Sequence, residues 1–257
     1  MKIERLAWAG IKVTVDDTVV AIDALGDASP LASFMGPPRH ELGEVADPGS
    51  LHAALVTHVH PDHYDPQTLH GCLEDGAEVL CPMTMRDQVV KDGLRPSILG
   101  PGDTTTAGGL QVTAVRAVDG LGEEQVSWIV SGGGGRILHC GDTLWHGYWW
   151  QIAEEHGPLD VAFLPINGAM VPWPTPTGIP ASLTPDQAVA AGLAVGAGLV
   201  VPIHYGTFDF PPSYCEFSNA EETFLDAARR RGLAVQVFTQ GETYLAGEHH
   251  ESKPPVS

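Results

Sequence analysis

The sequence predicts an α/β fold, a four-layer αββα sandwich in which two mixed β-sheets pack face to face and helices cover their outer faces. Two observations support this class. Strand-like segments outnumber helical ones in the first half of the chain, and strands alternate more clearly with helices in the second half. The pattern runs on without a linker, so we expect a single domain over residues 1–247 and a frayed tail over residues 248–257.

Short apolar runs between turn residues define the elements of the first half. Residues 11–15 and 18–22 predict a hairpin, and the Gly- and Pro-rich residues 26–50 predict a loop, either near the mouth of a site or on the surface. Asp65 followed by Pro66 is typical of a helix start. The other predicted elements are a helix over 84–91 and strands over 1–6, 79–81, 110–118, 125–130 and 136–140.

Two helix-start signals organise the second half. Thr184-Pro185-Asp186-Gln187 is a capping box that predicts a helix to about Val195, and Ser218-Asn219-Ala220-Glu221 predicts another helix to Arg231. Strands are predicted over 161–165, 199–203 and 235–238, the last of which closes the fold. The Pro-rich stretch Asn167–Leu183 has no periodicity and is predicted to be a loop.

The charge balance excludes several classes of partner. With 13 Lys and Arg against 32 Asp and Glu, the net charge is −19, which disfavours nucleic acids and anionic membranes. The chain shows neither a membrane-spanning apolar run nor a signal-peptide pattern, so we expect a cytoplasmic protein. Its four cysteines form no C-x-x-C pair and are expected to be reduced. A small-molecule substrate is the expected partner, and the oligomeric state, a homo-oligomer included, stays open.

Four metal-competent side chains follow one buried strand-like run. The segment Thr57-His58-Val59-His60-Pro61-Asp62-His63 comes after the apolar residues 53–56. Residues two apart in a strand face the same side, so His58 and His60 can reach one metal ion. Pro61 bends the chain, so that Asp62 and His63 can face a second ion beside the first. This spacing predicts a two-metal hydrolase.

Three further candidate ligands share one context, a polar residue just past an apolar strand. They are Asp119, Asp142 and His204. Strand ends that converge on one rim of a sandwich would bring them to the histidine cluster. Asp142 is the natural bridge, because one carboxylate can give an oxygen to each ion. His204 would complete the ligands of the second ion.

On these residues, the chain resembles the metallo-β-lactamase superfamily, and most of all the branch of L-ascorbate-6-phosphate lactonase and related uncharacterised metal-dependent hydrolases. The matching segments are residues 58–63, Gly141-Asp142-Thr143 and Pro202-Ile203-His204-Tyr205-Gly206-Thr207, within a resemblance that covers residues 3–246. The resemblance implies the metallo-β-lactamase fold and a binuclear metal-dependent hydrolase. It also implies two divalent ions as cofactors, zinc or manganese, with iron as the alternative.

The resemblance further implies a mechanism. Two ions about 3.5–4 Å apart would bridge a water and lower its pKa from ~16 towards ~7. Asp62 would bind one ion and orient or deprotonate that water, which would attack a lactone, ester, amide or phosphoester. In the Pro-rich stretch, Trp173 is expected either to cover the substrate or to pack its own loop, and Tyr205 is a candidate hydrogen-bond donor to the substrate.

One position departs from the family pattern. The family usually has a histidine where this chain has Asp119, so either Asp119 is a substituted ligand or the first metal site is weakened or empty. Carboxylate oxygen is harder than imidazole nitrogen and moves the preference towards manganese or iron. A redox di-iron protein on the same scaffold and an inactive binding module therefore stay open as alternatives. A phosphate-bearing substrate would need a basic side chain at the rim, for which only Arg39 and Arg116 are candidates.

Overall fold

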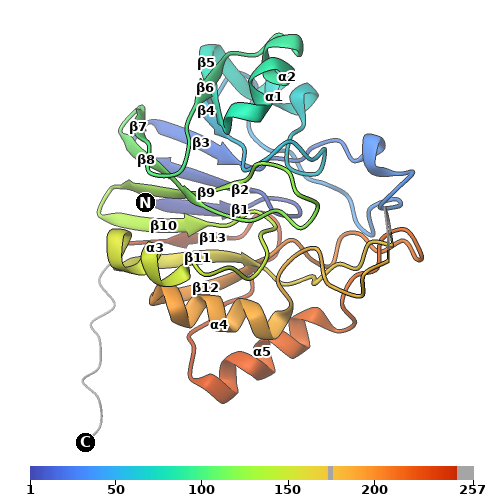
Figure 1. The fold of residues 1–257 in the computed structure, drawn as a ribbon. Helices are drawn as coiled ribbons and strands as arrows, with labels where there is room; N and C mark the ends of the chain where they lie inside the picture. The colour runs from blue at the N-terminus through green and yellow to red at the C-terminus, as the bar shows by residue number, and fades with distance from the viewer. Residues whose placement is uncertain (173–175, 248–257) are drawn as a thin grey trace, which may run out of the picture.

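Two β-sheets lie face to face between helices in the computed structural model, which describes residues 1–172 and 176–247 (Figure 1). Both sheets mix parallel and antiparallel pairs, and the predicted α/β class with two mixed sheets is confirmed. Trp173 and the predicted tail over residues 248–257 lie outside the described residues.

The first sheet has seven strands in the order β13-β1-β2-β3-β4-β5-β6. Strands β13, β1, β2 and β3 pair antiparallel, and β3 to β6 pair parallel. Their bounds are β1 (Lys2–Arg5), β2 (Ile11–Val15), β3 (Thr18–Ile22), β4 (Leu51–Leu55), β5 (Leu73–Cys81), β6 (Pro96–Ile98) and β13 (Thr243–Leu245).

The second sheet has six strands in the order β12-β11-β10-β9-β8-β7. Strands β7 to β10 pair antiparallel, and β10, β11 and β12 pair parallel. Their bounds are β7 (Thr104–Ala107), β8 (Leu110–Arg116), β9 (Val126–Gly132), β10 (Gly135–His139), β11 (Leu159–Pro165) and β12 (Ala197–Ile203).

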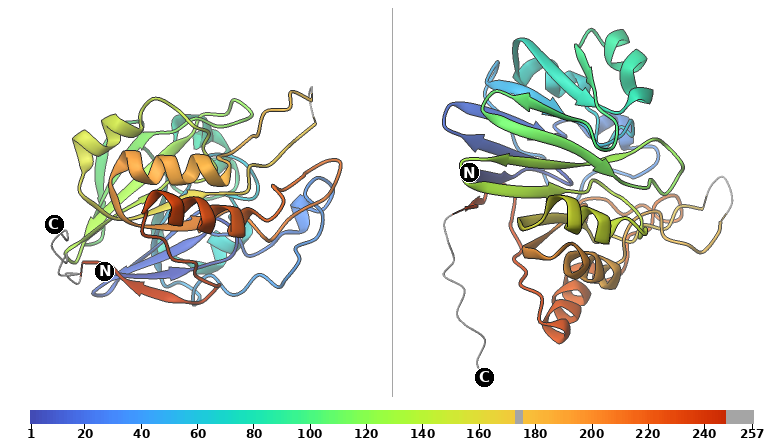
Figure 2. Two further views of the ribbon diagram at one scale, coloured as in Figure 1. Left: turned by 90° about the horizontal axis from the view of Figure 1, so that it is seen from below. Right: turned by 60° about the vertical axis from the view of Figure 1, so that its left-hand side comes forward.

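Helices cover the outer face of each sheet. The α-helices are α1 (Pro66–Cys72), α2 (Arg86–Lys91), α3 (Trp149–His156), α4 (Pro185–Val195) and α5 (Ala220–Arg231), and short 3-10 turns are η1 (Ser29–Leu31) and η2 (Met83–Met85). Helices α1 and α2 lie beside β4, β5 and β6, whereas α3, α4 and α5 lie against the second sheet (Figure 2).

The inner faces of the two sheets form the largest apolar core. Ile11 and Val13 of β2 are fully buried in the same cluster as Trp128 of β9 and Phe163 of β11. Alternate residues of β2 are buried, as expected for a strand with one face on the core. Separate clusters join the second sheet to its helices and the first sheet to α1 and α2. Each sheet therefore packs against the other sheet on one face and against helices on the other, which holds in place the strand ends where the site lies.

Three expectations about individual elements need correction. Residues 235–238 form no strand: Val235 makes only an isolated bridge with Val200, and β13 provides the last strand. The predicted helix over 84–91 begins with the 3-10 turn η2. The helix expected to run to Arg231 is present as α5, but the capping box expected from Ser218 to Glu221 is not: the N-cap position is Asn219, which has φ +55° and makes no side-chain cap hydrogen bond.

The ends of several strands from both sheets meet at one rim of the sandwich. Parallel pairing of β3 with β4, and of β10 with β11 and β12, brings their carboxyl ends to the same edge. Each of these chain segments then turns into a loop. The part of the chain that the structure describes contains no helix long and apolar enough to span a membrane.

Candidate metal centre

Seven side chains that could bind metal meet at this rim in two groups. The first comprises His58, His60, Asp119 and Asp142, and the second comprises Asp62, His63 and His204. In each group the candidate ligand atoms lie within 4.8 Å of one another. These are the seven residues that the sequence singled out, and the structure brings all of them together.

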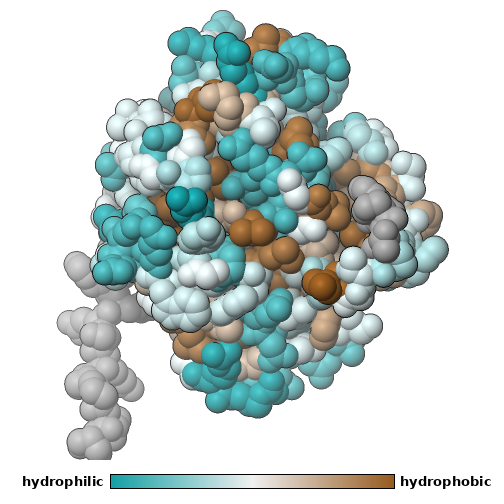
Figure 3. All heavy atoms as spheres, in the orientation of Figure 1, coloured by the Kyte–Doolittle hydropathy of each residue, from teal (hydrophilic) through white to brown (hydrophobic). Residues whose placement is uncertain are grey.

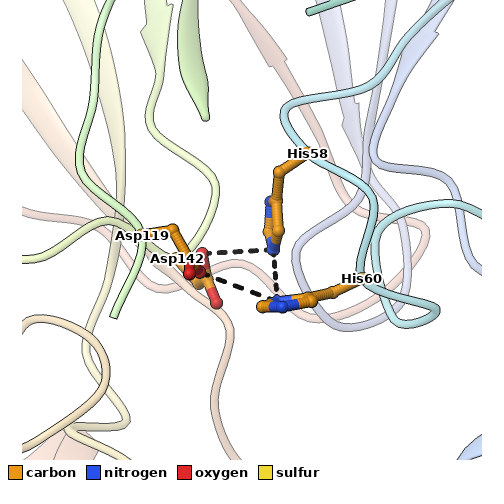
Figure 4. A group of neighbouring side chains, drawn as sticks. All are labelled: His58, His60, Asp119 and Asp142. Atoms are coloured by element: carbon orange, nitrogen blue, oxygen red, sulfur yellow. Dashed lines mark hydrogen bonds and ion pairs between the residues drawn. The ribbon is translucent and has the colours of Figure 1, made fainter. Parts of the chain in front are cut away.

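In the first group, two imidazoles and two carboxylates face a common point (Figure 4). Nε2 of His58 lies 2.8 Å from Nδ1 of His60 and 3.5 Å from Oδ1 of Asp142. Nδ1 of His60 lies 3.7 Å from Oδ1 of Asp119. Two nitrogens and two oxygens therefore converge, a donor set that suits a divalent transition metal.

The second group is buried and equally tight. Nε2 of His63 lies 3.0 Å from Nε2 of His204 and 3.4 Å from Oδ2 of Asp62. Nε2 of His204 lies 3.2 Å from the same oxygen of Asp62. Burial lowers the pKa of His204 to about 4, which keeps its imidazole in the neutral form that binds metals.

Asp142 lies between the two groups. Its Oδ1 is 3.5 Å from Nε2 of His58, and its Oδ2 is 3.9 Å from Nε2 of His63. Gln125 donates to Oδ1 from Nε2 at 3.1 Å and fixes the carboxylate. Burial raises the pKa of Asp142 to about 8, and the negative charges of neighbouring carboxylates add to this effect. Such clustered carboxylates repel one another unless a cation lies among them.

Asp119 carries the clearest sign that a cation fits here. Its Oδ1 is buried and, among the residues that the structure describes, has no hydrogen-bond partner. Its Oδ2 accepts from the backbone N–H groups of Leu121 at 2.7 Å and Glu123 at 2.9 Å, so the free oxygen is held in the direction of His60. A buried carboxylate oxygen without a donor is costly, and a metal ion would satisfy it. The residues present therefore fit a metal.

Asp23 supports both groups from behind. Its Oδ2 accepts from Nδ1 of His63 at 2.8 Å and from the hydroxyl of Thr57 at 2.8 Å, and its Oδ1 accepts from the Thr57 N–H. The Thr57 hydroxyl in turn lies 3.0 Å from Nδ1 of His58. Burial opposes protonation of His63, but the charges of Asp62 and Asp23 hold its pKa well above the usual value. Asp23 thus orients one imidazole in each group.

Trp8 holds Asp62 in place. Its indole Nε1–H donates to Oδ2 of Asp62 at 2.9 Å, and its ring lies 4.0 Å, centroid to centroid, from that of His204. The loop that carries Trp8 is fixed by Arg5, whose buried guanidinium donates to the backbone carbonyls of Leu6, Trp8 and Gly10. The sequence did not reveal Trp8, because it lies 54 residues from Asp62 and an indole is not a metal ligand that a spacing motif would mark.

A cavity of about 200 Å³ opens onto the two groups. Apart from metal-binding candidates its walls are mostly apolar and come from loops: Pro30, Leu31, Phe34, Met35, Pro61, Leu121, Ala169, Val171, Ala181, Ser182 and Tyr214. Residues 26–50 therefore reach the mouth of the site, and so does the Pro-rich stretch. In Figure 3, hydrophobic residues reach the surface on the right-hand side of the molecule, where Figure 1 shows long loops.

The structure does not bring the candidate Tyr205 to this cavity. Its hydroxyl donates to Glu221 at 2.8 Å, and its ring lines a separate hollow beside Arg5. Arg39 is paired with Asp209 and Glu216, and Arg116 lies over the ring of Tyr148. Among the described residues, no lysine or arginine lines the cavity. Tyr214 and Ser182 line it instead, and their positions in irregular loops gave no signal in the sequence.

The fold, the strand-end histidines and the paired carboxylates define a metallo-hydrolase of the metallo-β-lactamase fold. Residues 18–205 match the β-lactamase superfamily domain. A UPF0173 metal-dependent hydrolase of Rubrobacter xylanophilus is 31% identical over 207 residues, which cover 76% of this chain and 78% of that protein. The chain therefore belongs to the β-lactamase superfamily and, within it, to the UPF0173 metal-dependent hydrolases.

Two solved structures share the fold at low identity. Igni18, a metallo hydrolase from Ignicoccus hospitalis, has a TM-score of 0.68 at 21% identity and covers 95% of this chain and 97% of its own. CmlA, a diiron β-hydroxylase from Streptomyces venezuelae, has a TM-score of 0.70 at 16% identity and covers 95% of this chain and 53% of its own. The same fold thus occurs in proteins named for hydrolysis and for oxidation.

Proposed function

We propose that this metal-dependent hydrolase cleaves a small, uncharged carbonyl compound with apolar substituents, an ester, a lactone or an amide. The observation that carries the proposal is the pair of ligand groups joined by Asp142 and opening onto an apolar cavity. The cavity is smaller than the roughly 300–1,000 Å³ of sites for drug-sized ligands, so the substrate is small.

His58, His60 and Asp119 would hold one ion, Asp62, His63 and His204 a second, and Asp142 would contact both. When bound, the ions would supply Lewis acidity and a water acidic enough to react near neutral pH. The protein contributes orientation: Asp23 and Thr57 fix the imidazoles, and Trp8 fixes Asp62.

Asp62 is the proposed proton acceptor. Its contacts with Trp8, His63 and His204 all fall on Oδ2, and the residue also lines the cavity. Oδ1 carries none of these contacts. We assign to Oδ1 the proton of the attacking water, which Asp62 then passes to the leaving group.

The lining of the cavity guides the choice of substrate. Among the described lining residues there is no lysine or arginine, so a phosphoester or another anion would have only the metal ions as cationic partners, and three ligand carboxylates already offset part of their charge. This lining does not favour a phosphate-bearing substrate, and the likeness to the L-ascorbate-6-phosphate lactonase branch stays a prediction. A neutral carbonyl compound needs no basic side chain.

The donor set favours hard or borderline ions. Each group offers two imidazoles and one carboxylate besides the shared Asp142, so both sites would accept manganese or zinc. Two histidines with one carboxylate are also typical of non-haem iron, which favours a redox di-iron protein as the second candidate function. The orientation of Asp119 by two backbone N–H groups supports a working ligand rather than the remnant of a lost site.

Metal content and a substrate panel test the proposal. Metal-free protein refilled with manganese or zinc should bind two ions per chain and hydrolyse phenyl acetate or δ-valerolactone, but not 4-nitrophenyl phosphate. His60→Ala should abolish hydrolysis and lower the metal content, whereas His70→Ala, on the exposed side of α1, should change neither. Turnover retained in His60→Ala would remove the assignment, and iron with a visible absorption band would favour the redox candidate.

A further inference from the structure

A chain of buried hydrogen bonds runs along the wall of the cavity to the phenol of Tyr214. The backbone N–H of Ala169 donates to Oγ of Ser182 at 3.4 Å, and the Ser182 hydroxyl donates to Oδ1 of Asn167. Nδ2 of Asn167 then donates to the hydroxyl oxygen of Tyr214 at 2.6 Å. Asn167 is fully buried, Ser182 is 2% exposed and Tyr214 is 5% exposed.

The direction of these bonds fixes the direction of the phenol proton. Since Ser182 gives its proton to Oδ1, the other end of the Asn167 amide is the NH₂ group, which only donates. The hydroxyl oxygen of Tyr214 therefore accepts from Asn167 and keeps its own proton for another partner. Tyr214 lines the cavity, and among the described residues no acceptor for this proton is found.

The surroundings keep this donor protonated and in place. Burial, together with the negative charges of Asp62 and Asp142, raises the pKa of Tyr214 well above its usual value. The phenol is therefore neutral near neutral pH. Its ring packs edge-on against Phe34 across the cavity wall, with centroids 5.9 Å apart. A donor held by ring packing on one side and by an amide on the other needs little reorganisation.

We propose that the Tyr214 hydroxyl donates a hydrogen bond to the carbonyl oxygen of the substrate, and that Asn167 is the positioning residue that reserves this proton. The inference rests on the proposed function and names the group that recognises the carbonyl. During hydrolysis the water oxygen adds to the carbonyl carbon, negative charge builds on the carbonyl oxygen, and the bond to the leaving group then breaks. Tyr214 keeps its proton throughout and stabilises the charge by hydrogen bonding alone.

Tyr214→Phe tests the donor, because it removes one oxygen and keeps the ring against Phe34. Loss of one such donor should lower kcat for phenyl acetate by about 100-fold while KM and the content of two ions stay nearly unchanged. Tyr64→Phe is the matched control: Tyr64 is also 5% exposed, and its hydroxyl donates to Asp92 at 3.0 Å, away from the cavity. The control should lose stability only. A Tyr214→Phe enzyme with the kcat of the unmodified protein would overturn the proposal.

Asn167→Asp tests the positioning role without changing side-chain size. A carboxylate oxygen in place of the NH₂ group accepts the phenol proton and turns it away from the cavity, so kcat should fall as in Tyr214→Phe. The double variant should be no slower than either single variant, since both remove the same bond. Independent, multiplicative losses in the double variant would contradict a role through Tyr214. If Asn167→Asp fails to fold, Tyr214→Phe still decides the proposal.

A spectroscopic test separates this inference from the proposed function. Acetophenone labelled with ¹³C at the carbonyl is small, neutral and not hydrolysable, and its carbonyl stretch should shift to lower frequency on binding. The shift should be smaller in Tyr214→Phe and unchanged in Tyr64→Phe. If the unmodified protein hydrolyses no ester but shows the shift, the function fails and the donor stands. If it hydrolyses phenyl acetate without a shift that depends on Tyr214, the donor fails and the function stands.

Discussion

Replacing Asp23 by Asn should weaken both proposed metal sites, although Asp23 belongs to neither ligand group. The substitution keeps size and shape and exchanges one carboxylate oxygen for an NH₂ group. Asp23 accepts three hydrogen bonds, one from His63 and two from Thr57, and is fully buried. An Asn at this position can keep the bond from the Thr57 N–H through its oxygen. Its NH₂ group then faces the Thr57 hydroxyl and Nδ1 of His63, which are both donors to Asp23.

The size of the effect follows from these contacts. Loss of a partner that orients a ligating histidine costs about 10- to 100-fold in metal affinity, or about 1.4–2.7 kcal/mol per site. Both sites are affected, since Asp23 reaches His63 directly and His58 through Thr57. Leaving a buried donor unpaired adds about 1–3 kcal/mol to the loss of folding stability. Thr57→Val, in contrast, removes the hydroxyl that links Asp23 to His58 but keeps the bond between Asp23 and His63, and it should weaken the first site more than the second.

Competition with a chromophoric chelator measures both affinities in metal-free protein refilled with manganese. Denaturant unfolding gives the stability of the same samples. Asp65→Asn is the matched control, because Asp65 is also a buried carboxylate that accepts three N–H groups, from Gly26, Asp27 and Thr68, but it caps α1. The control should change stability without changing metal affinity. Two sites of undiminished affinity in Asp23→Asn would refute the support assigned to this carboxylate.

Three further outcomes are expected. Burial lowers the pKa of His146 from 6.5 to about 4, so as the pH falls the unfolded chain binds a proton before the folded protein does. Up to about 3 kcal/mol of stability is therefore lost between pH 6.5 and pH 4. The stability of His146→Asn, measured by unfolding at several pH values, should be less sensitive to acid. Tyr205→Phe should leave kcat unchanged, because the Tyr205 hydroxyl binds Glu221 outside the cavity. A large loss of kcat would support the expectation from the sequence that Tyr205 donates to the substrate. In Gly120→Ala the new Cβ would overlap the carbonyl oxygen of Ala181, and denaturant unfolding should show a loss of about 1–3 kcal/mol in stability. Gly147 has open space around it, so Gly147→Ala should show no such loss.

Positions that follow from strand geometry could be predicted from the sequence. An apolar run followed by a polar residue marks a strand end, and parallel strands bring such ends to one edge. His204 directly follows β12, and His58, Asp142 and Asp119 each come three residues after the ends of β4, β10 and β8. The predicted capping box at Thr184 is present with both of its hydrogen bonds. The metal-binding candidates could be found because they depend on regular structure.

Positions that depend on irregular loops could not be predicted. Tyr214 and Asn167 meet across 47 residues of sequence, and their hydrogen bond depends on how two loops fold against each other. Helix α3 was missed for a related reason: Tyr148 precedes it without a side-chain cap, so no start signal is present. The substrate side of the site is therefore less predictable than the metal side, because loops make up most of the cavity wall.

Backbone strain gathers around the second ligand group and explains why its geometry has no simple sequence signature. Trp8, Asp23 and His204 all adopt left-handed backbone conformations, with φ of 55°, 47° and 58°. Each costs about 1–3 kcal/mol for a residue with a side chain, a large share of the about 5–15 kcal/mol that stabilises a domain. Glycine would relieve the strain but would remove the indole, the carboxylate or the imidazole that the site uses. Trp8 and His204 are tied together instead, because the Trp8 carbonyl accepts from the His204 N–H at 3.2 Å and from the buried guanidinium of Arg5. Contacts from the rest of the fold must hold these strained conformations. The geometry of the site therefore depends on the packing of Arg5 and the strands as much as on the ligand residues themselves.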